Sequence, residues 1–558
     1  MKIIKVSDYL VSRLKKCGIE TYFGVQGGAI AHVIESSAKI SNFIPVFNEQ
    51  AGGLAAHGYY FSKKKPAAVL TTTGPGFLNG VTGMGACYYD NIPSVFITGQ
   101  VSKELNLAKK FNIKMYGFQE VQHIDIGKNI SDHHFVINSD YSLVHFIRYL
   151  ESINYNIKNT IFIEIQDAFS RSFVKYRKSN KILKNKIQLI PKEKIKKIRE
   201  LINNSLNPLL LIGAGFSDFN SRILIKKISK RLNIPVCYSW GGSPHMDENS
   251  DLNLGYFGMH NPGIANKFIQ SSDLLISVGI SFLQHQVGKE RNRFSPHAQF
   301  IYVNKNNYSQ KRVNYDFQNK IINIKCDSSN FLENLLKIKI KPKKLDLKKI
   351  KNYNFKQYSK PVKIIAEILS QFRDKNKRKE KFIFSDAGST LSWTYQAANI
   401  VKKSNVITSF NIHTMGYSIP AGIGAALNKD KDILSIIGDG GLLMNVQELV
   451  NFCRVSKNLK IVIIDNKGYG IIRQTQDDFF QSNYIGTKIG LKNNMPKFNV
   501  KNIVESFNLK VKVENENISQ KAIKNFFNSS VNCLVININT KYKVENLKPN
   551  NKNDYLVF

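Results

Sequence analysis

The chain has 558 residues, of which 42% are hydrophobic and 22% are charged. This length exceeds what one hydrophobic core organises, so several domains are expected. The formal net charge is +39, and many of the basic residues lie in two connecting stretches, residues 175–197 and 337–360, without a nucleic-acid-binding motif. That distribution favours solvated surface charge over a nucleic-acid partner.

The sequence also lacks the features of membrane insertion and secretion. It contains no apolar run of the ~18 residues that mark a transmembrane candidate. Residues 1–20 read as a charged helix without a signal-peptide core. The six cysteines are scattered, which predicts buried free thiols rather than a metal site or disulfides. We therefore expect a cytoplasmic location and no membrane partner.

Three blocks follow one another along the chain, residues 1–170, 190–336 and 361–545. Short apolar runs alternate with Gly- and Ala-rich helical stretches in the first block, as in Ala67–Thr71 followed by Asn79–Tyr88. Buried strands that end in glycines mark the other two, for example Leu274–Gly279 and Ile433–Gly438. Such alternation is typical of parallel sheets covered by helices. The sequence therefore predicts an α/β fold with three doubly wound parallel-sheet domains.

One motif in the third block indicates a metal site. Gly438-Asp439-Gly440-Gly441 follows one strand, and Asp465-Asn466-Lys467-Gly468 follows the next, with Asp439 and Asn466 separated by 466 − 439 = 27 positions. That length fits a strand–helix–strand crossover, which places both side chains at the carboxyl edge of neighbouring strands. The carboxylate of Asp439, the amide oxygen of Asn466 and the carbonyl of Gly468 suit Mg²⁺. A glycine–aspartate turn alone would be weak evidence.

This pair resembles the thiamine diphosphate motif, with Asp465 in place of its first asparagine. The chain as a whole resembles the acetolactate synthase family, whose segments FGYPGGAI, TSGPGATN, GTMG and GDGSFQMNIQEL are similar to residues 23–30, 73–79, 413–416 and 438–449. The resemblance implies a pyrimidine-binding first domain, a Rossmann-like central domain and a third domain that binds the diphosphate with Mg²⁺. It also implies a homodimer or homotetramer in which the first and third domains of different subunits share each site.

The resemblance further assigns roles to individual residues. Glu49 is implied to bond the aminopyrimidine ring and to exchange a proton with it, and its apolar flanks predict partial burial. Gln119 and Gly28 are implied to line the reaction site together with Phe118. The residues implied to contact the cofactor are Gly74, Pro75, Asn79, Gly388, Ser389, Thr390, His413, Met415, Gly438, Gly440 and Gly441. His413 stands where the family has glycine, and Ser389-Thr390 stand where it has Gln-His.

Two departures from the family bear on the reaction. Residues 279–288 replace the family's RFDDRVTG segment, so Ser281 stands in place of an arginine that faces the second substrate, and little or no FAD is expected. Thr475 replaces a tryptophan on the substrate side. We therefore expect a decarboxylase or carboligase that transfers a two-carbon unit from a 2-keto acid such as pyruvate to a carbonyl acceptor other than a plain 2-keto acid. A true acetolactate synthase is the alternative, and a non-catalytic anion-binding homologue is a second one.

Overall fold

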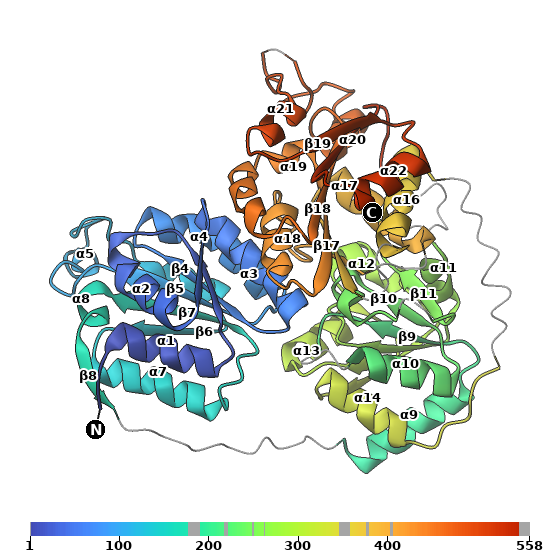
Figure 1. Ribbon diagram of the computed structural model, residues 1–558. Coiled ribbons are helices and arrows are strands. Elements are labelled where there is room, and N and C mark those ends of the chain that lie inside the picture. Colours follow the sequence, from blue (N-terminus) through green and yellow to red (C-terminus); the bar gives the residue numbers. More distant parts are fainter. Residues whose placement is uncertain are drawn as a thin grey trace.

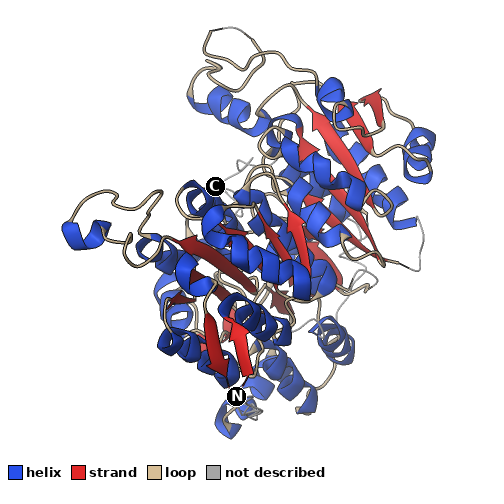
Figure 2. Cartoon of the chain, turned by 60° about the vertical axis from the view of Figure 1, so that its left-hand side comes forward, coloured by secondary structure: helices blue, strands red, loops and turns tan. Residues whose placement is uncertain are grey.

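The computed structural model describes residues 2–176, 190–216, 221–247, 250–261, 263–344, 358–374, 379–401, 405–490 and 492–545. Three six-stranded sheets, each parallel throughout, form three domains in chain order (Figure 1). Helices cover both faces of the sheets (Figure 2). The predicted fold class is therefore confirmed. Most of the two Lys-rich linkers and of the polar C-terminal tail lies outside the described residues.

The N-terminal domain has the strand order β3-β2-β4-β5-β7-β6. Its central strands are buried at every position, because helices pack on both faces of the sheet. The strands of this sheet are β2 Thr21–Gly24, β3 Asn42–Pro45, β4 Ala67–Thr71, β5 Ser94–Gln100, β6 His133–Ile137 and β7 Thr160–Gln166. The longer helices are α1 Val6–Lys16, α2 Ala31–Ile40, α3 Glu49–Lys63, α4 Pro75–Tyr89 and α7 Asp140–Ser152.

The central domain has a different strand order, β11-β10-β9-β12-β13-β14, so its topological switch point lies between β9 and β12. The strands of this sheet are β9 Pro208–Ile212, β10 Val236–Tyr238, β11 Asn253–Tyr256, β12 Leu274–Val278, β13 Gln299–Val303 and β14 Ile321–Ile324. The helices are α9 Lys192–Asn204, α10 Ser221–Leu232, α11 Ile264–Ser271, α12 Gln284–Val287, α13 Asn307–Asp316 and α14 Ser328–Lys337.

The C-terminal domain has the order β16-β15-β17-β18-β20-β19, which repeats the order of the N-terminal sheet strand for strand. Its strands are β15 Glu380–Ser385, β16 Val406–Ile407, β17 Lys431–Gly438, β18 Leu459–Asp465, β19 Val511–Asn515 and β20 Cys533–Asn537. The helices are α16 Lys360–Asp374, α17 Ser389–Ile400, α18 Ser418–Ala426, α19 Asp439–Leu442, α20 Gly470–Phe479, α21 Val500–Glu505 and α22 Gln520–Asn528, with the 3-10 helix η6 at Val446–Arg454.

Some local predictions differ from the structure. The N-terminus was expected to be helical throughout, but Lys2–Lys5 forms strand β1, which pairs antiparallel with β8, Phe173–Tyr176. The reason is tertiary, because the partner strand lies at the far end of the same domain. Among the cysteines, Cys453 is exposed rather than buried. None of the described helices is long and apolar enough to cross a membrane.

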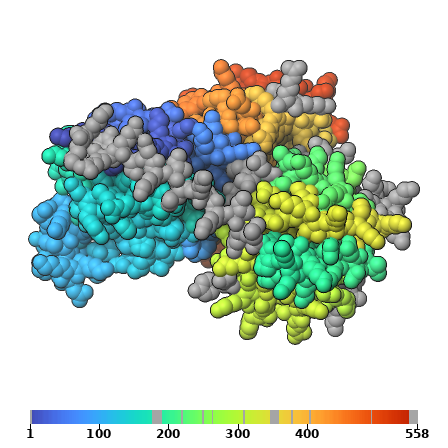
Figure 3. Space-filling view, turned by 90° about the horizontal axis from the view of Figure 1, so that it is seen from below, coloured from blue at the N-terminus to red at the C-terminus, as the bar shows by residue number. Residues whose placement is uncertain are grey.

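The N- and C-terminal domains of the chain meet where α3 and α18 cross. A Cβ added at Gly58 would overlap the carbonyl of Ala421, and one added at Gly424 would overlap the carbonyl of Ala55. The two helix backbones therefore touch directly, which only glycine at these positions permits. Seen from below, the N-terminal and central domains lie side by side, and the C-terminal domain lies along one edge (Figure 3).

Gly58→Ala should destabilise the protein, because its Cβ has to displace the backbone of α18. Overpacking of this kind costs about 1–3 kcal/mol. The matched control is Gly85→Ala in α4, where the nearest atom to the added Cβ is Ile412 Cδ1 at 3.9 Å. Thermal unfolding should show a lower midpoint for Gly58→Ala and none of that loss for Gly85→Ala. Equal midpoints would contradict the close helix contact.

Candidate functional site

The predicted metal ligands lie together at the carboxyl edge of the C-terminal sheet. Strands β17 and β18 pair in parallel with Gly438 opposite Ile464, so Asp439 and Asn466 follow adjacent strand ends. Asp439 is fully buried, and its Oδ2 accepts a hydrogen bond of 2.7 Å from the backbone N–H of Gly468. The crossover that the 27-residue spacing predicts is therefore present.

The side-chain amide of Asn466 lies beside both Asp439 and Gly468. One of its terminal atoms lies 2.7 Å from the carbonyl oxygen of Gly468 and 2.9 Å from Asp439 Oδ1. With nitrogen at that position the amide donates to both oxygens, whereas with oxygen there, three oxygens converge on one point. A hard cation such as Mg²⁺ satisfies the second arrangement, so the donor set fits the metal that the resemblance implies. No cluster of three His, Cys, Asp or Glu residues able to hold a metal occurs in the described part of the chain. A bound diphosphate and water would supply further oxygens at this site.

Backbone geometry holds the turn that carries these ligands. Gly468 has φ of 114°, a conformation that favours glycine. The buried guanidinium of Arg473 donates to the carbonyls of Asn466 at 2.7 Å, of Lys467 at 2.7 Å and of Thr487 at 3.1 Å. Gly440 faces the ring of Tyr469 so closely that a Cβ would overlap it. Glycine at these two positions therefore allows Tyr469 and Thr487 to pack directly against the backbone of the turn.

Burial makes the negative charge of Asp439 costly to keep. Desolvation, followed by the nearby negative charge of Asp465, raises the pKa of Asp439 to about 7. Asp465 itself is paired with the ammonium of Lys467. A proton therefore competes with a cation for Asp439 in the neutral pH range.

The predicted diphosphate-binding residues Gly388, Ser389 and Thr390 border the same site. They lie where β15 ends and α17 begins, so the free N–H groups of a 12-residue helix face this edge. A Cβ on Gly438 would lie 3.2 Å from Thr390 Oγ1, which places that hydroxyl beside the metal turn. Hydroxyls and helix N–H groups are suitable donors to phosphate oxygens.

His413 and Met415 lie on the loop between β16 and α18. His413 has φ of 50°, a left-handed conformation that suits the glycine found there in the family. Asp386, which the sequence reading missed, fixes the end of this loop. Its carboxylate accepts from the N–H groups of Gly416 and Ser418, each at 2.9 Å, and burial raises its pKa to about 6. Its position directly after strand β15 was the available signal.

The predicted N-terminal residues form a second group at the carboxyl edge of their own sheet. Glu49 is the first residue of α3 and is 6% exposed, and its Oε2 accepts from Asn79 Nδ2 at 3.2 Å. Gly74 and Pro75 begin α4, and a Cβ on Gly74 would lie 2.9 Å from Gln119 Cβ. Nothing lies within 4 Å of a Cβ on Gly28. Glu49 is therefore buried beside Asn79, and the backbone at Gly28 has open space in front of it.

Glu448 was also missed by the sequence reading. It lies on η6 of the C-terminal domain, is buried, and its Oε1 accepts from Phe47 N at 2.8 Å. Asn451 donates to the carbonyl of Pro45 at 2.9 Å and to Glu448 Oε2 at 3.3 Å. Desolvation raises the pKa of Glu448 to about 7. The C-terminal domain thus holds the loop that leads into Glu49.

The two groups remain separate within one chain. Among the described residues, no hydrogen bond or ion pair joins the group around Glu49 to the group around Asp439. Large apolar side chains near both groups are exposed, including Phe118 at 81%, Phe47, Met444 and Ile472. Each group is half of the predicted site.

The segment that departs from the family lines a cavity of about 740 Å³ between the three domains. Gly279, Ser281 and His285 form one wall, and Asp90 and Phe410 belong to another. Two nearby cations, Arg291 and Arg293, could replace the missing arginine. Arg293 pairs with Glu290 at 3.2 Å. Arg291 is also held by its neighbours. Its Nη1 donates to the carbonyl of Phe282 at 2.6 Å and pairs with Asp316 at 3.0 Å.

Beside this cavity, Trp240 joins the central and C-terminal domains. Its ring stacks on Tyr395 at 4.6 Å and on His285 at 5.4 Å, and it meets His413 edge-on at 5.6 Å. Burial, with a smaller contribution from His413, lowers the pKa of His260 and His285 to about 3. Both rings are therefore neutral near pH 7 and pack against Trp240.

Comparison with known families agrees with this geometry. Residues 4–126 match the N-terminal TPP binding domain of thiamine pyrophosphate enzymes, residues 195–335 match their central domain, and residues 386–538 match their C-terminal TPP binding domain. The chain therefore belongs to the thiamine pyrophosphate enzyme family.

Within that family it is a distant relative of acetolactate synthase large subunits. It is 26% identical over 500 residues to the acetolactate synthase isozyme 2 large subunit of Escherichia coli, which covers 87% of each chain. It is 28% identical over 517 residues to a probable acetolactate synthase large subunit of Methanococcus aeolicus, covering 87% of this chain and 84% of that one. A chloroplastic acetolactate synthase of Arabidopsis thaliana is 27% identical over 507 residues, covering 87% and 73%.

Mg²⁺ affinity should fall about tenfold per pH unit below the pKa of Asp439, about 7, and level off above it, because the metal binds only the ionised carboxylate. Calorimetry of Mg²⁺-dependent thiamine diphosphate binding at pH 6 and pH 8 measures this. Asp439→Ala should abolish the Mg²⁺ dependence. Asp465→Asn should lower the midpoint of the pH profile, because it removes a neighbouring negative charge. Undiminished binding by Asp439→Ala would contradict the assignment.

Proposed function

We propose that this chain is a thiamine-diphosphate- and Mg²⁺-dependent enzyme that decarboxylates a 2-keto acid and transfers the remaining two-carbon unit to a carbonyl acceptor. The observation that carries the proposal is the convergence of Asp439, Asn466 and the carbonyl of Gly468 on one point, in a chain that also has a buried carboxylate at Glu49. The TPP binding domains imply the cofactor.

The residues of the chain then have distinct tasks. Asp439, Asn466 and Gly468 hold Mg²⁺, and Ser389 and Thr390 donate to the diphosphate. Glu49 exchanges a proton with the aminopyrimidine ring, and its contact with Asn79 keeps the carboxylate oriented. When bound, thiamine diphosphate supplies the electron sink that decarboxylation of a 2-keto acid requires. Gln119 and Gly28 line the space for the substrate.

The proposal includes a homodimer or homotetramer. The half-site around Glu49 and the half-site around Asp439 belong to different domains without a direct polar contact, and exposed apolar residues such as Phe118 and Met444 surround them. A second copy would bury these side chains and bring Glu49 of one chain to the metal site of the other. This arrangement is supported by the resemblance and by the exposure of those residues.

The acceptor is proposed to lack the carboxylate of a plain 2-keto acid. An arginine binds such a carboxylate through two N–H groups and always stays charged. In this chain Ser281 stands at the position where the family has that arginine. Arg291 pairs with Asp316 and donates to the backbone carbonyl of Phe282, so its Nη1 is already engaged by partners within the chain. Loss of a charge-assisted hydrogen bond lowers selectivity by roughly ten- to a hundredfold. An aldehyde or a ketone such as a keto-sugar needs no partner for a carboxylate and is therefore the acceptor that we propose. The same segment lacks the family's acidic and arginine residues, so little or no bound FAD remains our expectation.

A true acetolactate synthase is the second candidate. It is favoured by the names of the relatives, whose similarity extends over most of the chain. The two candidates differ in the acceptor, and they share thiamine diphosphate, the metal and the role of Glu49.

Glu49→Gln should bind cofactor but lose about 10²–10⁴-fold in activity, because an amide cannot exchange a proton with the ring. Exchange of the thiazolium C2 proton, followed by NMR, measures the role directly without knowledge of the acceptor. The matched control is Glu35→Gln on the surface of α2, where Glu35 pairs with Lys5 and Lys39. Undiminished exchange in Glu49→Gln would rule out the proposed role.

Pyruvate supplied alone should yield little acetolactate. Ser281→Arg should raise acetolactate formation by roughly ten- to a hundredfold, because it restores a charged partner for the acceptor carboxylate. Product analysis with and without added aldehydes and keto-sugars distinguishes the acceptors. Efficient acetolactate formation by the wild type, with kcat/KM of about 10⁴ M⁻¹s⁻¹ or more, would instead favour the second candidate.

A further inference from the structure

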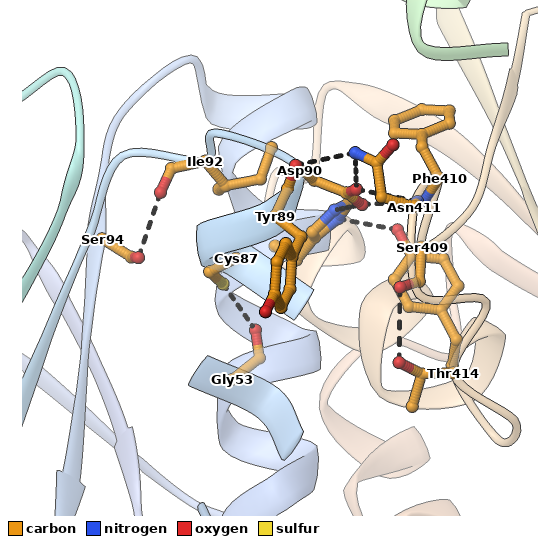
Figure 4. A network of polar contacts seen from close by, with 12 residues as sticks. Gly53, Cys87, Tyr89, Asp90, Ile92, Ser94, Ser409, Phe410, Asn411 and Thr414 are labelled. Carbon is orange, nitrogen blue, oxygen red and sulfur yellow. Dashed lines mark hydrogen bonds and ion pairs between the residues drawn. The ribbon is translucent and has the colours of Figure 1, made fainter. Parts of the chain in front are cut away.

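The loop Ser409–Gly416, which connects β16 to α18, carries His413 and Met415. Asp386 holds its C-terminal end from within the same domain. Its N-terminal end is held by Asp90, the residue that ends α4 in the N-terminal domain (Figure 4). The position of this loop therefore depends on a contact between two domains.

Asp90 binds the backbone of the loop with both carboxylate oxygens. Oδ2 accepts from Phe410 N at 2.7 Å, and Oδ1 accepts from Asn411 N at 3.0 Å. The side chain of Asn411 adds a bond to Oδ1 at 2.8 Å and one to the carbonyl of Tyr89 at 2.7 Å. Asp90 is only 5% exposed. A carboxylate that accepts from two backbone N–H groups fixes the direction of the loop as well as its distance from Asp90.

His57 and Tyr417 complete the contact from the crossing of α3 and α18. His57 Nε2 lies 2.9 Å from Asp90 Oδ2, and Nδ1 lies 2.8 Å from the hydroxyl of Tyr417. Since both oxygens of Asp90 accept from backbone N–H groups, His57 Nε2 is the donor to Asp90, and Nδ1 faces the hydroxyl of Tyr417. All three side chains are buried. The network thus links the N-terminal domain to residues on both sides of Met415.

We propose that Asp90 is a positioning residue that sets Met415 for the bound cofactor by binding the backbone of Phe410 and Asn411. The inference rests on the proposed function, in which Met415 contacts thiamine diphosphate. Asp386 fixes the end of the loop at Gly416 from within the C-terminal domain. Asp90 supplies the second point of attachment, at the other end of the loop. The contact between α3 and α18 therefore determines the position of Met415, the side chain that would face the cofactor.

The primary test is Asp90→Asn in the full-length protein with Mg²⁺ present. Its amide nitrogen would face the N–H of Asn411 in one orientation and the N–H groups of Phe410 and His57 in the other, so one of the two backbone bonds is lost. Thiamine diphosphate affinity, measured by calorimetry, should fall about ten- to a hundredfold, the range for a hydrogen bond to a charged group. The control is Ser62→Ala, which removes a buried 2.8 Å bond to the carbonyl of Ala425 in the same helix pair but away from the loop. That variant should melt earlier and bind cofactor as the wild type does.

A double-mutant cycle separates positioning from a general loss of structure. If Asp90 acts through Met415, Asp90→Asn should weaken binding far less in a Met415→Ala background than in the wild type. Multiplicative effects would overturn the proposal. Asn411→Ala removes only the side-chain bonds to Asp90 and Tyr89 and should weaken binding several-fold. It takes the place of Asp90→Asn as the test if that variant does not fold. Wild-type affinity in Asn411→Ala or Asp90→Asn would also overturn it. Failure of the wild type to bind thiamine diphosphate would instead contradict the proposed function.

Discussion

The direct backbone contact between α3 and α18 is the constraint on which the arrangement of the candidate site depends. Gly58 and Gly424 let the two helices touch without intervening side chains. That approach brings Asp90 to the backbone of Phe410 and brings Glu448 to the backbone of Phe47. Each domain therefore holds the loop of the other domain that carries a residue of the site. A small change in the crossing of the helices would move both loops at once.

Topology explains where the polar residues gather. The N- and C-terminal sheets have the same strand order, and in each the predicted residues lie at the carboxyl edge near the switch point, where the chain leaves in opposite directions. The loops there leave backbone N–H groups unpaired by strands, so carboxylates and phosphates find donors. The central sheet has its switch point between β9 and β12, and the walls of its cavity come from all three domains. Changes in residues 279–288 therefore alter a space that the other two domains share.

Sequence alone predicted the three domains and the neighbouring positions of Asp439 and Asn466, because strand length, glycine-ended strands and a 27-residue crossover are local signals. It did not predict the contacts that fix the loops. Asp90 lies 320 positions before Phe410, and Phe47 lies 401 before Glu448. No periodicity links residues so far apart, and an aspartate or glutamate at a helix end usually reads as a solvated charge. The strand at Lys2–Lys5 escaped prediction for the same reason, since its partner strand lies near residue 175.

The charges of the site argue against simple anion binding. The chain has a formal surplus of +39, yet Asp439 is buried and forms no ion pair with a lysine or arginine among the described residues. An unpaired buried carboxylate repels a phosphate and is costly to keep ionised, as the pKa of about 7 for Asp439 reflects. A divalent cation reverses both effects, because it pairs with the carboxylate and presents a positive charge to the diphosphate. The carbonyl oxygen of Gly468 and the side-chain amide of Asn466 lie beside Asp439, where both can serve such a cation. Under the proposed function the surface lysines would contribute little to recognition at the site, because a metal held by Asp439 would supply the positive charge that the phosphates need.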